Sequence, residues 1–289
     1  MNALAPLLSL GLASLVFGPS ALGERGTDER STQACVASDS VVITQLAVAG
    51  WMVSAGGRTL IIDALHRHPR HAPVAETLER LEHASPPFDE IELVLVSHAH
   101  SDHFHYESTA EHLRRNPNAV LVSGRLVHDQ LTELSDFERF SDRVIVAAPE
   151  PGEVVELDAN GMKIKVFRLS HGEPNADYSA DNLGMIVDLC GVKVLNTGDI
   201  VPTGQTAVFR QALPGSEGVD IAFLAFTMFD EENLPEAATI IDDYIKPRYI
   251  IPSHLYEQHF GEFTKAIEDR YPKAVIFHSK GEVKVRVTR

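Results

Sequence analysis

The sequence predicts a layered α/β sandwich, and three observations favour it. From about residue 40 onward, short apolar or β-branched runs typical of strands alternate with stretches typical of helices. Both halves of the chain are rich in strands and have helices outside them, an arrangement in which helices cover sheets. There is no repeat, low-complexity tract or long linker. With 289 residues, 44% hydrophobic and 23% charged, the chain is long enough for one packed domain, which we expect over residues 41–289.

The first half predicts an antiparallel meander followed by a buried strand. Glycines separate the three strands of this meander, which are expected at residues 41–48, 51–55 and 59–63. Residues 93–96 form a continuous apolar run, which is typical of a strand covered on both faces. A short helix is expected at residues 109–115.

The second half continues this alternation. Strands are expected at residues 162–169, 184–189, 192–195, 220–226 and 249–251. Pro235 suits the first turn of a helix that runs to Tyr244 and ends before Pro247. A further helix is expected at residues 258–270, and residues 274–278 and 283–287 are expected to form a closing pair of strands.

The first 23 residues have the pattern of a secretory signal peptide. Residues 7–17 form an apolar run that is too short to span a membrane, and Ala21-Leu22-Gly23 offers a cleavage site between small residues. A flexible polar segment is expected over residues 24–40. The pattern predicts a secreted or periplasmic protein with no stable membrane anchor. The alternative is an apolar N-terminus without a role in export, since Met1 to Pro6 carry no lysine or arginine.

The only two cysteines are Cys35 and Cys190, and they are far apart in the sequence. A zinc ribbon is excluded because no Cys-x-x-Cys spacing exists. In an oxidising compartment the two residues could form a disulfide that closes a long loop, and their spacing leaves this open.

The charge balance disfavours a nucleic-acid partner. Forty-one acidic residues against 25 lysines and arginines give a formal charge of −16, and no substantial basic cluster is present. Such a protein repels polyanions at long range. A small-molecule substrate is expected instead.

The most informative segment is His98-Ala99-His100-Ser101-Asp102-His103, which follows the buried strand. Side chains two apart in an extended chain point the same way, so His98 and His100 can bind one ion. The turn that follows brings Asp102 and His103 toward a second ion. Imidazole and carboxylate ligands without thiolate suit zinc, and also manganese or iron. The alternative is a solvated loop rich in histidine.

Three further candidate ligands stand at the ends of predicted strands, where the loops of a layered α/β protein gather. They are His171, Asp199 and His254. Any one of them alone would more often be structural, but their order along the chain is informative.

Taken together, the HAHSDH segment, His171, the Thr-Gly-Asp of Asp199 and the Pro-Ser-His of His254 resemble the metallo-β-lactamase superfamily over about residues 41–288. The resemblance implies a four-layer αββα sandwich with two metals in the cleft between its halves. It implies that His98, His100 and His171 hold the first metal, that Asp102, His103 and His254 hold the second, and that Asp199 bridges both.

The stretch from Val219 to His254 is similar to the ascorbate-phosphate lactonase-like branch of that superfamily. That branch often has a histidine after the first glycine of the meander, where this chain has Trp51. Asp199 argues against antibiotic hydrolysis, since β-lactamases with this motif generally lack the bridging aspartate. His100 argues against oxygen or nitric oxide reduction, since the flavodiiron relatives have a carboxylate there.

These residues predict a binuclear hydrolase of small esters, lactones, amides or phosphodiesters. Two divalent ions generate hydroxide near neutral pH and stabilise the developing charge. Asp102 or Asp199 could carry the proton to the leaving group. No Gly-x-Ser-x-Gly elbow is present, which disfavours a serine nucleophile. The rival interpretations are a nuclease of the same superfamily, which needs basic surfaces, and a non-catalytic metal-binding module, which predicts missing ligands.

Substrate recognition is expected from the loops at residues 65–73 and 173–182 and from side chains close to the ligands. The alternative for each of these side chains is that it orients a ligating histidine or is a solvated loop residue; they are His105, Tyr178, Asn182, Thr227, Tyr256 and His259. The extra histidines His66, His68 and His71 lie outside the motif, and we expect them in a solvated loop.

Overall fold

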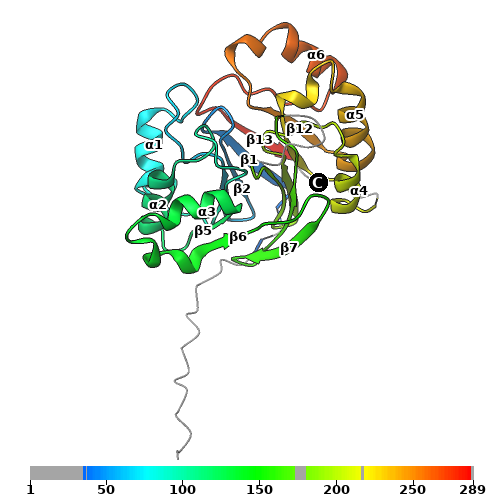
Figure 1. Ribbon diagram of the computed structural model, residues 1–289. Helices are drawn as coiled ribbons and strands as arrows, with labels where there is room; N and C mark the ends of the chain where they lie inside the picture. Colours follow the sequence, from blue (N-terminus) through cyan, green and yellow to red (C-terminus); the bar gives the residue numbers. More distant parts are fainter. Residues whose placement is uncertain (1–34, 37, 173–179, 216–217, 288–289) are drawn as a thin grey trace, which may run out of the picture. The chain divides into compact units, whose positions relative to one another are not determined.

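Two β-sheets lie face to face, and helices cover the outer face of each (Figure 1). This computed structural model describes residues 35, 36, 38–172, 180–215 and 218–287, which belong to a compact unit over residues 32–289. The predicted layered α/β sandwich is therefore confirmed. The predicted signal peptide, residues 1–23, lies outside the described residues, as does most of the segment over residues 24–40.

The first sheet has seven strands among the described residues. In spatial order they are β13 (Val283–Val287), β1 (Ser40–Gln45), β2 (Trp51–Ala55), β3 (Arg58–Ile62), β4 (Leu93–Leu95), β5 (Val120–Ser123) and β6 (Val144–Val146). The strands from β13 to β3 are antiparallel, as the meander predicted, and those from β3 to β6 are parallel. Strand β4 is buried along its whole length, which explains its continuous apolar sequence.

The second sheet has six strands in the described part of the chain. In spatial order they are β12 (Tyr249–Ser253), β11 (Ile221–Ala225), β10 (Val192–Asn196), β9 (Leu183–Leu189), β8 (Met162–Arg168) and β7 (Val154–Ala159). Strands β12, β11 and β10 are parallel, whereas β10 to β7 are antiparallel. Strand β8 consequently runs in the same direction as β10 and β12.

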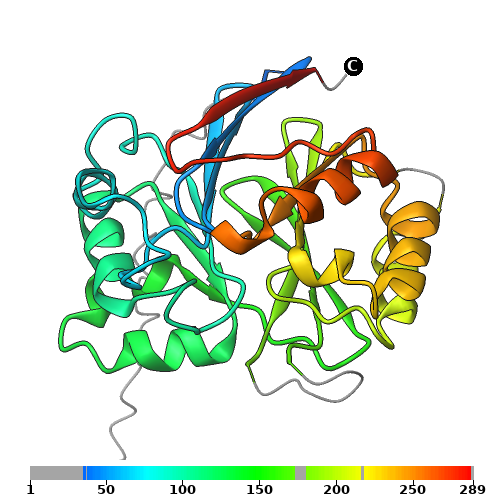
Figure 2. The same ribbon diagram turned by 90° about the horizontal axis from the view of Figure 1, so that it is seen from above.

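Helices flank both sheets, as Figure 2 shows from above. Those on the first sheet are α1 (Ala75–Glu82), α2 (Tyr106–Arg115) and α3 (Arg125–Thr132), followed by 3₁₀ turns η1 (Phe137–Arg139) and η2 (Ser141–Arg143). Those on the second sheet are α4 (Thr206–Ala212), α5 (Leu234–Thr239), the π-helical η4 (Ile240–Ile245) and α6 (Glu262–Arg270). Two short 3₁₀ turns, η3 (Phe226–Phe229) and η5 (Glu257–His259), follow β11 and β12.

Three apolar clusters hold the layers together. The central one lies between the sheets and includes Trp51, whose ring packs 4.9 Å from that of Phe223 and 5.1 Å from that of Phe277. The outer clusters lie between each sheet and its helices. On α3, for example, Val127 and Leu131 are buried one turn apart, so one face of the helix packs on the sheet.

One pairing predicted from the sequence is wrong. Residues 274–278 do not form a strand with residues 283–287. Strand β13 pairs instead with β1, where Thr44 lies opposite Val283 and Val42 opposite Val285. Residues 274–278 run beside β12 with a single bridge, Ile250 to Ala274. They fill the core with Val275, Ile276 and Phe277.

Element boundaries also differ from those expected. The first strand ends at Gln45, because Leu46 and Ala47 both donate to the carbonyl of Gly50 in a turn. The helix expected from residue 109 begins at Tyr106, because His105 caps it by accepting the N–H of Ser108. The helix expected over residues 235–244 changes from α to π at Ile240.

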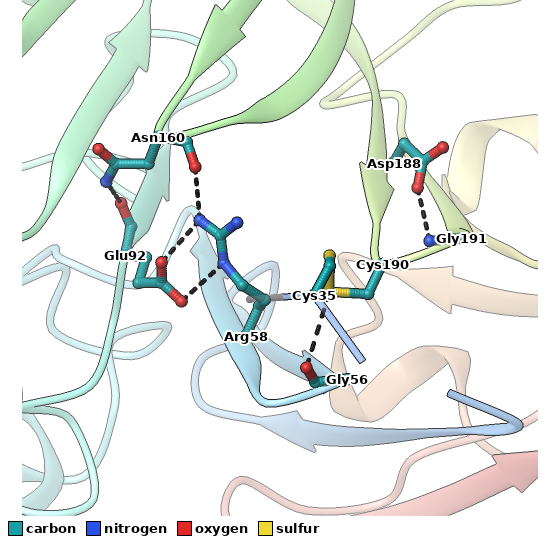
Figure 3. Close-up of a disulfide and its surroundings, with 8 residues drawn as sticks. All are labelled: Cys35, Gly56, Arg58, Glu92, Asn160, Asp188, Cys190 and Gly191. Atoms are coloured by element: carbon teal, nitrogen blue, oxygen red, sulfur yellow. Dashed lines mark hydrogen bonds and ion pairs between the residues drawn. A yellow bond between two sulfur atoms is a disulfide. The ribbon is translucent and has the colours of Figure 1, made fainter. Parts of the chain in front are cut away.

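The end of the sandwich at the β9–β10 turn is tied across the two sheets (Figure 3). A disulfide joins Cys35, just before β1, to Cys190 in that turn. Nearby, the buried Arg58 of β3 pairs with Glu92 at 2.6 Å and donates to the carbonyl of Asn160 in the β7–β8 turn. The disulfide spans 155 residues, a closure worth about 5 kcal/mol in the chain-entropy account.

No helix in the described ranges is long and apolar enough to span a bilayer.

His112 on α2 makes stability depend on pH. Its Nδ1 donates to the carbonyl of Leu81 at the end of α1, 2.6 Å away. Burial outweighs this bond and lowers the pKa of His112 to about 4, against 6.5 in the unfolded chain. Between these values only the unfolded chain binds the proton. The free energy of unfolding therefore falls as the pH drops from 6.5 to 4, by about 3 kcal/mol in total.

We expect His112→Gln to remove this part of the pH dependence, because glutamine can donate to Leu81 but does not titrate. Urea unfolding of both proteins, with a chelator present, should show the smaller loss between pH 7.5 and pH 4 in the variant. An equal loss of unfolding free energy in the two proteins would contradict the assignment of this pH dependence to His112.

Candidate metal centre

The carboxyl ends of strands from both sheets meet at one edge of the sandwich. The segment His98 to His103 follows β4, His171 follows β8, Asp199 follows β10 and His254 follows β12. Because β8, β10 and β12 run in the same direction, their ends lie on the same side of the second sheet. All seven predicted ligands are thereby brought together.

His98, His100 and His171 form the first group. Their ligating nitrogens lie within 4.8 Å of one another. His98 Nε2 is 3.1 Å from His100 Nδ1. The ring of His171 is 4.9 Å from that of His98 and 4.7 Å from that of His100. Three converging imidazoles without a thiolate suit a divalent transition metal.

Asp102, His103 and His254 form the second group, again with ligand atoms within 4.8 Å. His254 Nε2 lies 3.3 Å from Asp102 Oδ2. The rings of His103 and His254 are stacked with centroids 5.2 Å apart. This donor set, two imidazoles and one carboxylate, can hold a second cation beside the first group.

Asp199 lies between the two groups. Its Oδ2 is 3.9 Å from His98 Nε2 and 3.7 Å from His171 Nε2. The same oxygen is 3.2 Å from His103 Nε2 and 3.3 Å from His254 Nε2. One carboxylate oxygen thus faces nitrogens of both groups.

The protonation of the cluster fits cation binding. Burial, followed by the charge of His103, holds the pKa of His98 well below its usual value, so the ring is in the neutral form that binds metals. Burial would raise the pKa of Asp199, but His103 and His254 outweigh it and hold that pKa well below its usual range. The Nε2 atoms of His171 and His254 are buried without a hydrogen-bond partner among the described residues. Buried nitrogens without a hydrogen-bond partner are available to bind a cation.

Asp63, which the sequence analysis did not single out, lies behind His103 and orients its ring. Its carboxylate is buried at the end of β3. It accepts hydrogen bonds from the backbone N–H and the hydroxyl of Ser97, both at 2.7 Å, and lies 3.1 Å from His103 Nδ1. This leaves His103 Nε2 facing Asp199. A carboxylate behind a ligating imidazole fixes the ring and its tautomer. The signal was present in the sequence as an aspartate that ends an apolar strand.

Local backbone geometry positions the ligands after β10 and β12. Gly198 has a φ of 53°, and a Cβ there would collide with the side chain of Asn182, so glycine is required before Asp199. Asn182 Oδ1 accepts the N–H of Asp199. His254 also has a positive φ, 63°, and its N–H donates to the carbonyl of Val48. This uncommon conformation for a histidine turns the chain at the cluster.

Trp51, which stands where the lactonase-like branch often has histidine, is fully buried. Its Nε1 donates to Ser253 Oγ at 3.0 Å, next to the ligand His254. The residue therefore supports β12 from the core.

The expectation that His66, His68 and His71 lie in a solvated loop is wrong for two of them. His66 is fully buried, and His71 lies against the cluster with Nδ1 3.2 Å from Asp102 Oδ2. His68 is partly exposed and stacks on His71 at 4.1 Å. The reason lies in contacts with residues distant in sequence. The N–H of Val48 and the ammonium of Lys280 donate hydrogen bonds to backbone carbonyls of this loop and hold it against the cluster.

Some of the other residues expected in substrate recognition lie close to the ligands, and others do not. Asn182 is buried and supports Asp199, whereas His105 caps α2, where its Nδ1 accepts the N–H of Ser108. The Thr227 hydroxyl donates to the carbonyl of Ile200, which follows Asp199. Tyr256 packs 5.0 Å from the ring of His254, and His259 accepts the N–H of Tyr256. Tyr178 lies outside the described residues.

Comparison with known protein families shows to which family the chain belongs. Residues 58–278 match the family described as the beta-lactamase superfamily domain. The chain belongs to the metallo-β-lactamase superfamily. The resemblance inferred from the motifs is thereby confirmed, and the matched range contains all seven residues of the metal cluster.

Two curated members of this superfamily are similar to the chain over much of its length. A UPF0173 metal-dependent hydrolase of Cupriavidus necator is 26% identical over 69% of this chain and 68% of its own length. A second, from Pelotomaculum thermopropionicum, is 27% identical over 83% of this chain and 97% of its own. Among solved structures, the metallo hydrolase Igni18 of Ignicoccus hospitalis shares the fold with a TM-score of 0.60 and 20% identity, over 86% of this chain and 100% of that one.

We expect Asp199→Asn to weaken metal binding at both groups, because Asp199 Oδ2 faces nitrogens from each. The loss of zinc affinity should exceed the roughly 10–100-fold loss caused by removing a group that only hydrogen-bonds to a metal ligand. Calorimetric titration of the metal-free protein with zinc measures it.

Asp129→Asn is the matched control for this variant. Asp129 is exposed on α3, far along the chain from every candidate ligand, so its substitution should leave the zinc titration unchanged. Equal zinc affinity in Asp199→Asn and the parent protein would rule out Asp199 as a ligand.

Proposed function

We propose that this chain, a metal-dependent hydrolase of the metallo-β-lactamase superfamily, binds two divalent metals in adjacent sites and hydrolyses a small ester, lactone, amide or phosphodiester. The observation that carries the proposal is the position of Asp199, whose Oδ2 lies within 3.9 Å of nitrogens from both histidine groups. A mononuclear site does not need a carboxylate shared in this way.

The residues that would hold the metals fall into two sets. His98, His100 and His171 would bind one cation, and Asp102, His103 and His254 would bind the other, with Asp199 between them. Zinc suits these nitrogen and oxygen donors best, while manganese and iron are also compatible. Bound there, the cations supply an activated water and polarise the bond to be cleaved.

The chain's own residues then determine orientation and proton transfer. Asp63 holds His103 in place, so that its Nε2 faces the centre. Asp102 faces two imidazoles, those of His71 and His254, whereas Asp199 faces four, which makes Asp102 the less constrained carboxylate for carrying a proton to a leaving group.

Tyr256 supplies a neutral hydrogen-bond donor at the edge of the centre. Burial, together with the carboxylates of Asp102 and Asp199, raises the pKa of the Tyr256 phenol well above its ordinary value. The phenol therefore keeps its proton over the whole physiological range and can donate a hydrogen bond to an oxygen that gains negative charge during cleavage.

The size of the adjoining space and the charge favour a small substrate. A groove of about 720 Å³ borders the cluster, within the range of pockets that hold small molecules. A nuclease of the same superfamily is the second candidate, but a chain with a formal charge of −16 offers polyanions no attraction.

We expect kcat/KM for small lactones, esters or single-phosphate diesters to exceed that for oligonucleotides. The comparison should be made at low salt, where electrostatic attraction to a nucleic acid is greatest. Zinc-loaded and manganese-loaded protein would be assayed side by side. A tenfold or greater preference for oligonucleotides would replace this proposal with the nuclease interpretation.

We also propose that the protein is exported, to the periplasm or beyond the cell. Two features support this: the apolar run at residues 7–17, and the disulfide between Cys35 and Cys190, since disulfides persist in oxidising compartments.

Intact-mass spectrometry of the native protein tests export. We expect a mature N-terminus near Glu24 and a mass two hydrogens below that of the reduced chain, because the bridge removes both thiol protons. A chain that retains Met1 and is recovered from the cytosol would refute the proposal.

A further inference from the structure

The groove of about 720 Å³ opens directly beside the second ligand group. Two of its lining residues also touch that group. His71 Nδ1 lies 3.2 Å from Asp102 Oδ2, and the ring of Tyr256 packs 5.0 Å from that of His254. A molecule in the groove therefore reaches the metal centre on its Asp102 side.

The groove lies between segments that are far apart in sequence. It is lined by Arg70 and His71, by residues 255–258 and Phe260 after β12, and by residues 278–280. The last two segments are in contact, with the rings of Phe260 and His278 5.5 Å apart, and Figure 2 shows them in orange and red. Gln45, at the end of β1, also lines the groove.

The charge of this lining is opposite to that of the whole protein. Arg70 and Lys280 are its cationic residues, and Glu257 is its only carboxylate. Among the described residues, no carboxylate forms an ion pair with Arg70. Such a local positive charge attracts anions to the groove, even in a protein with a formal charge of −16.

The loop that presents Arg70 is held firmly. Lys280 Nζ donates to the carbonyls of Arg70 and Ala72, at 3.1 and 2.5 Å. The N–H of Val48 donates to the carbonyl of His71 at 3.0 Å. Burial lowers the pKa of Lys280, in keeping with its place beneath the loop. Arg70 thus projects from a fixed backbone, which reduces the entropy lost when its guanidinium binds a ligand.

Neutral hydrogen-bonding groups complete the lining. Gln45 is more than nine-tenths buried, and its Oε1 has no hydrogen-bond partner in the described part of the chain. Tyr256 also lines the groove, with its ring 5.0 Å from that of His254. The guanidinium of Arg70 and the phenol of Tyr256 are hydrogen-bond donors and suit the oxygens of a carboxylate, whereas Gln45 Oε1 is an acceptor and suits a donor group elsewhere on a ligand.

We propose that this groove is an anion subsite, in which Arg70 binds a carboxylate on the substrate while the scissile bond lies at the metal centre. The substrate would be a small ester, lactone or amide that carries a carboxylate away from the bond that is cleaved. This inference rests on the proposed hydrolase function, and it adds the chemical class of the substrate.

Binding tests the subsite without turnover. Ligand-observed saturation-transfer NMR on the zinc-loaded full-length protein would compare pentanoate with the neutral pentanamide. We expect pentanoate to bind at least about tenfold more tightly, as a charge-assisted hydrogen bond provides. Arg70→Gln should remove this preference. Arg210→Gln, which removes the same charge from the exposed face of α4, should retain it.

A preference that survives in Arg70→Gln would mean that pentanoate binds the zinc instead, and it would overturn the proposal. Equal binding of the two probes to the parent protein would overturn it as well.

Kinetics with a matched pair of esters separates the subsite from the function. Mono(4-nitrophenyl) glutarate carries a carboxylate, and 4-nitrophenyl pentanoate does not. We expect the ratio of their kcat/KM values to favour the glutarate by about tenfold, and to fall in Arg70→Gln but not in Arg210→Gln. Hydrolysis without this preference would refute the subsite and leave the hydrolase function intact. Preferential binding of pentanoate without hydrolysis of either ester would support the subsite and count against ester hydrolysis.

Discussion

The metal centre depends on one buried carboxylate, that of Asp63. A carboxylate removed from water must have its oxygens satisfied by the protein, and here both the backbone and hydroxyl of Ser97 and the ring of His103 do so. These bonds tie the end of β3 to the end of β4, and they fix the direction in which the His98–His103 segment leaves the sheet. Without these bonds, neither the turn at residues 98–103 nor the ring of His103 would be held in this orientation.

Site residues that lie close together in the sequence could be predicted, whereas those positioned by contacts with distant residues could not. His98, His100, Asp102 and His103 lie within one turn after a buried strand, so spacing alone indicated that they share a function. Residues such as Asp199 and His254 were found because each ends a strand, and strand ends meet at a sheet edge. The place of His71 could not be predicted, because it depends on Lys280, which is more than two hundred residues away in the sequence.

The fold shows the same limit. Alternation of apolar residues identified most strands of the meander, but it does not specify which strand pairs with which. Strand β13 was therefore assigned to the wrong neighbour. Its true partner is β1, at the other end of the chain, while residues 274–278 contribute Phe277 to the core beside Trp51. Short elements with little periodicity, such as β6 or α4, gave no clear signal in the sequence.

The two ends of the sandwich differ in how they are held. Ligands and loops converge at one end, whereas Cys190 precedes β10 and so lies at the other. The strand between Cys190 and Asp199 has five residues, a length of about 17 Å. The covalent bridge to Cys35 therefore sets the point at which the chain enters the fold, well away from the catalytic face. Attachment of the enzyme to a surface near Cys35, at the end that the disulfide closes, would therefore leave the metal cluster open to substrate.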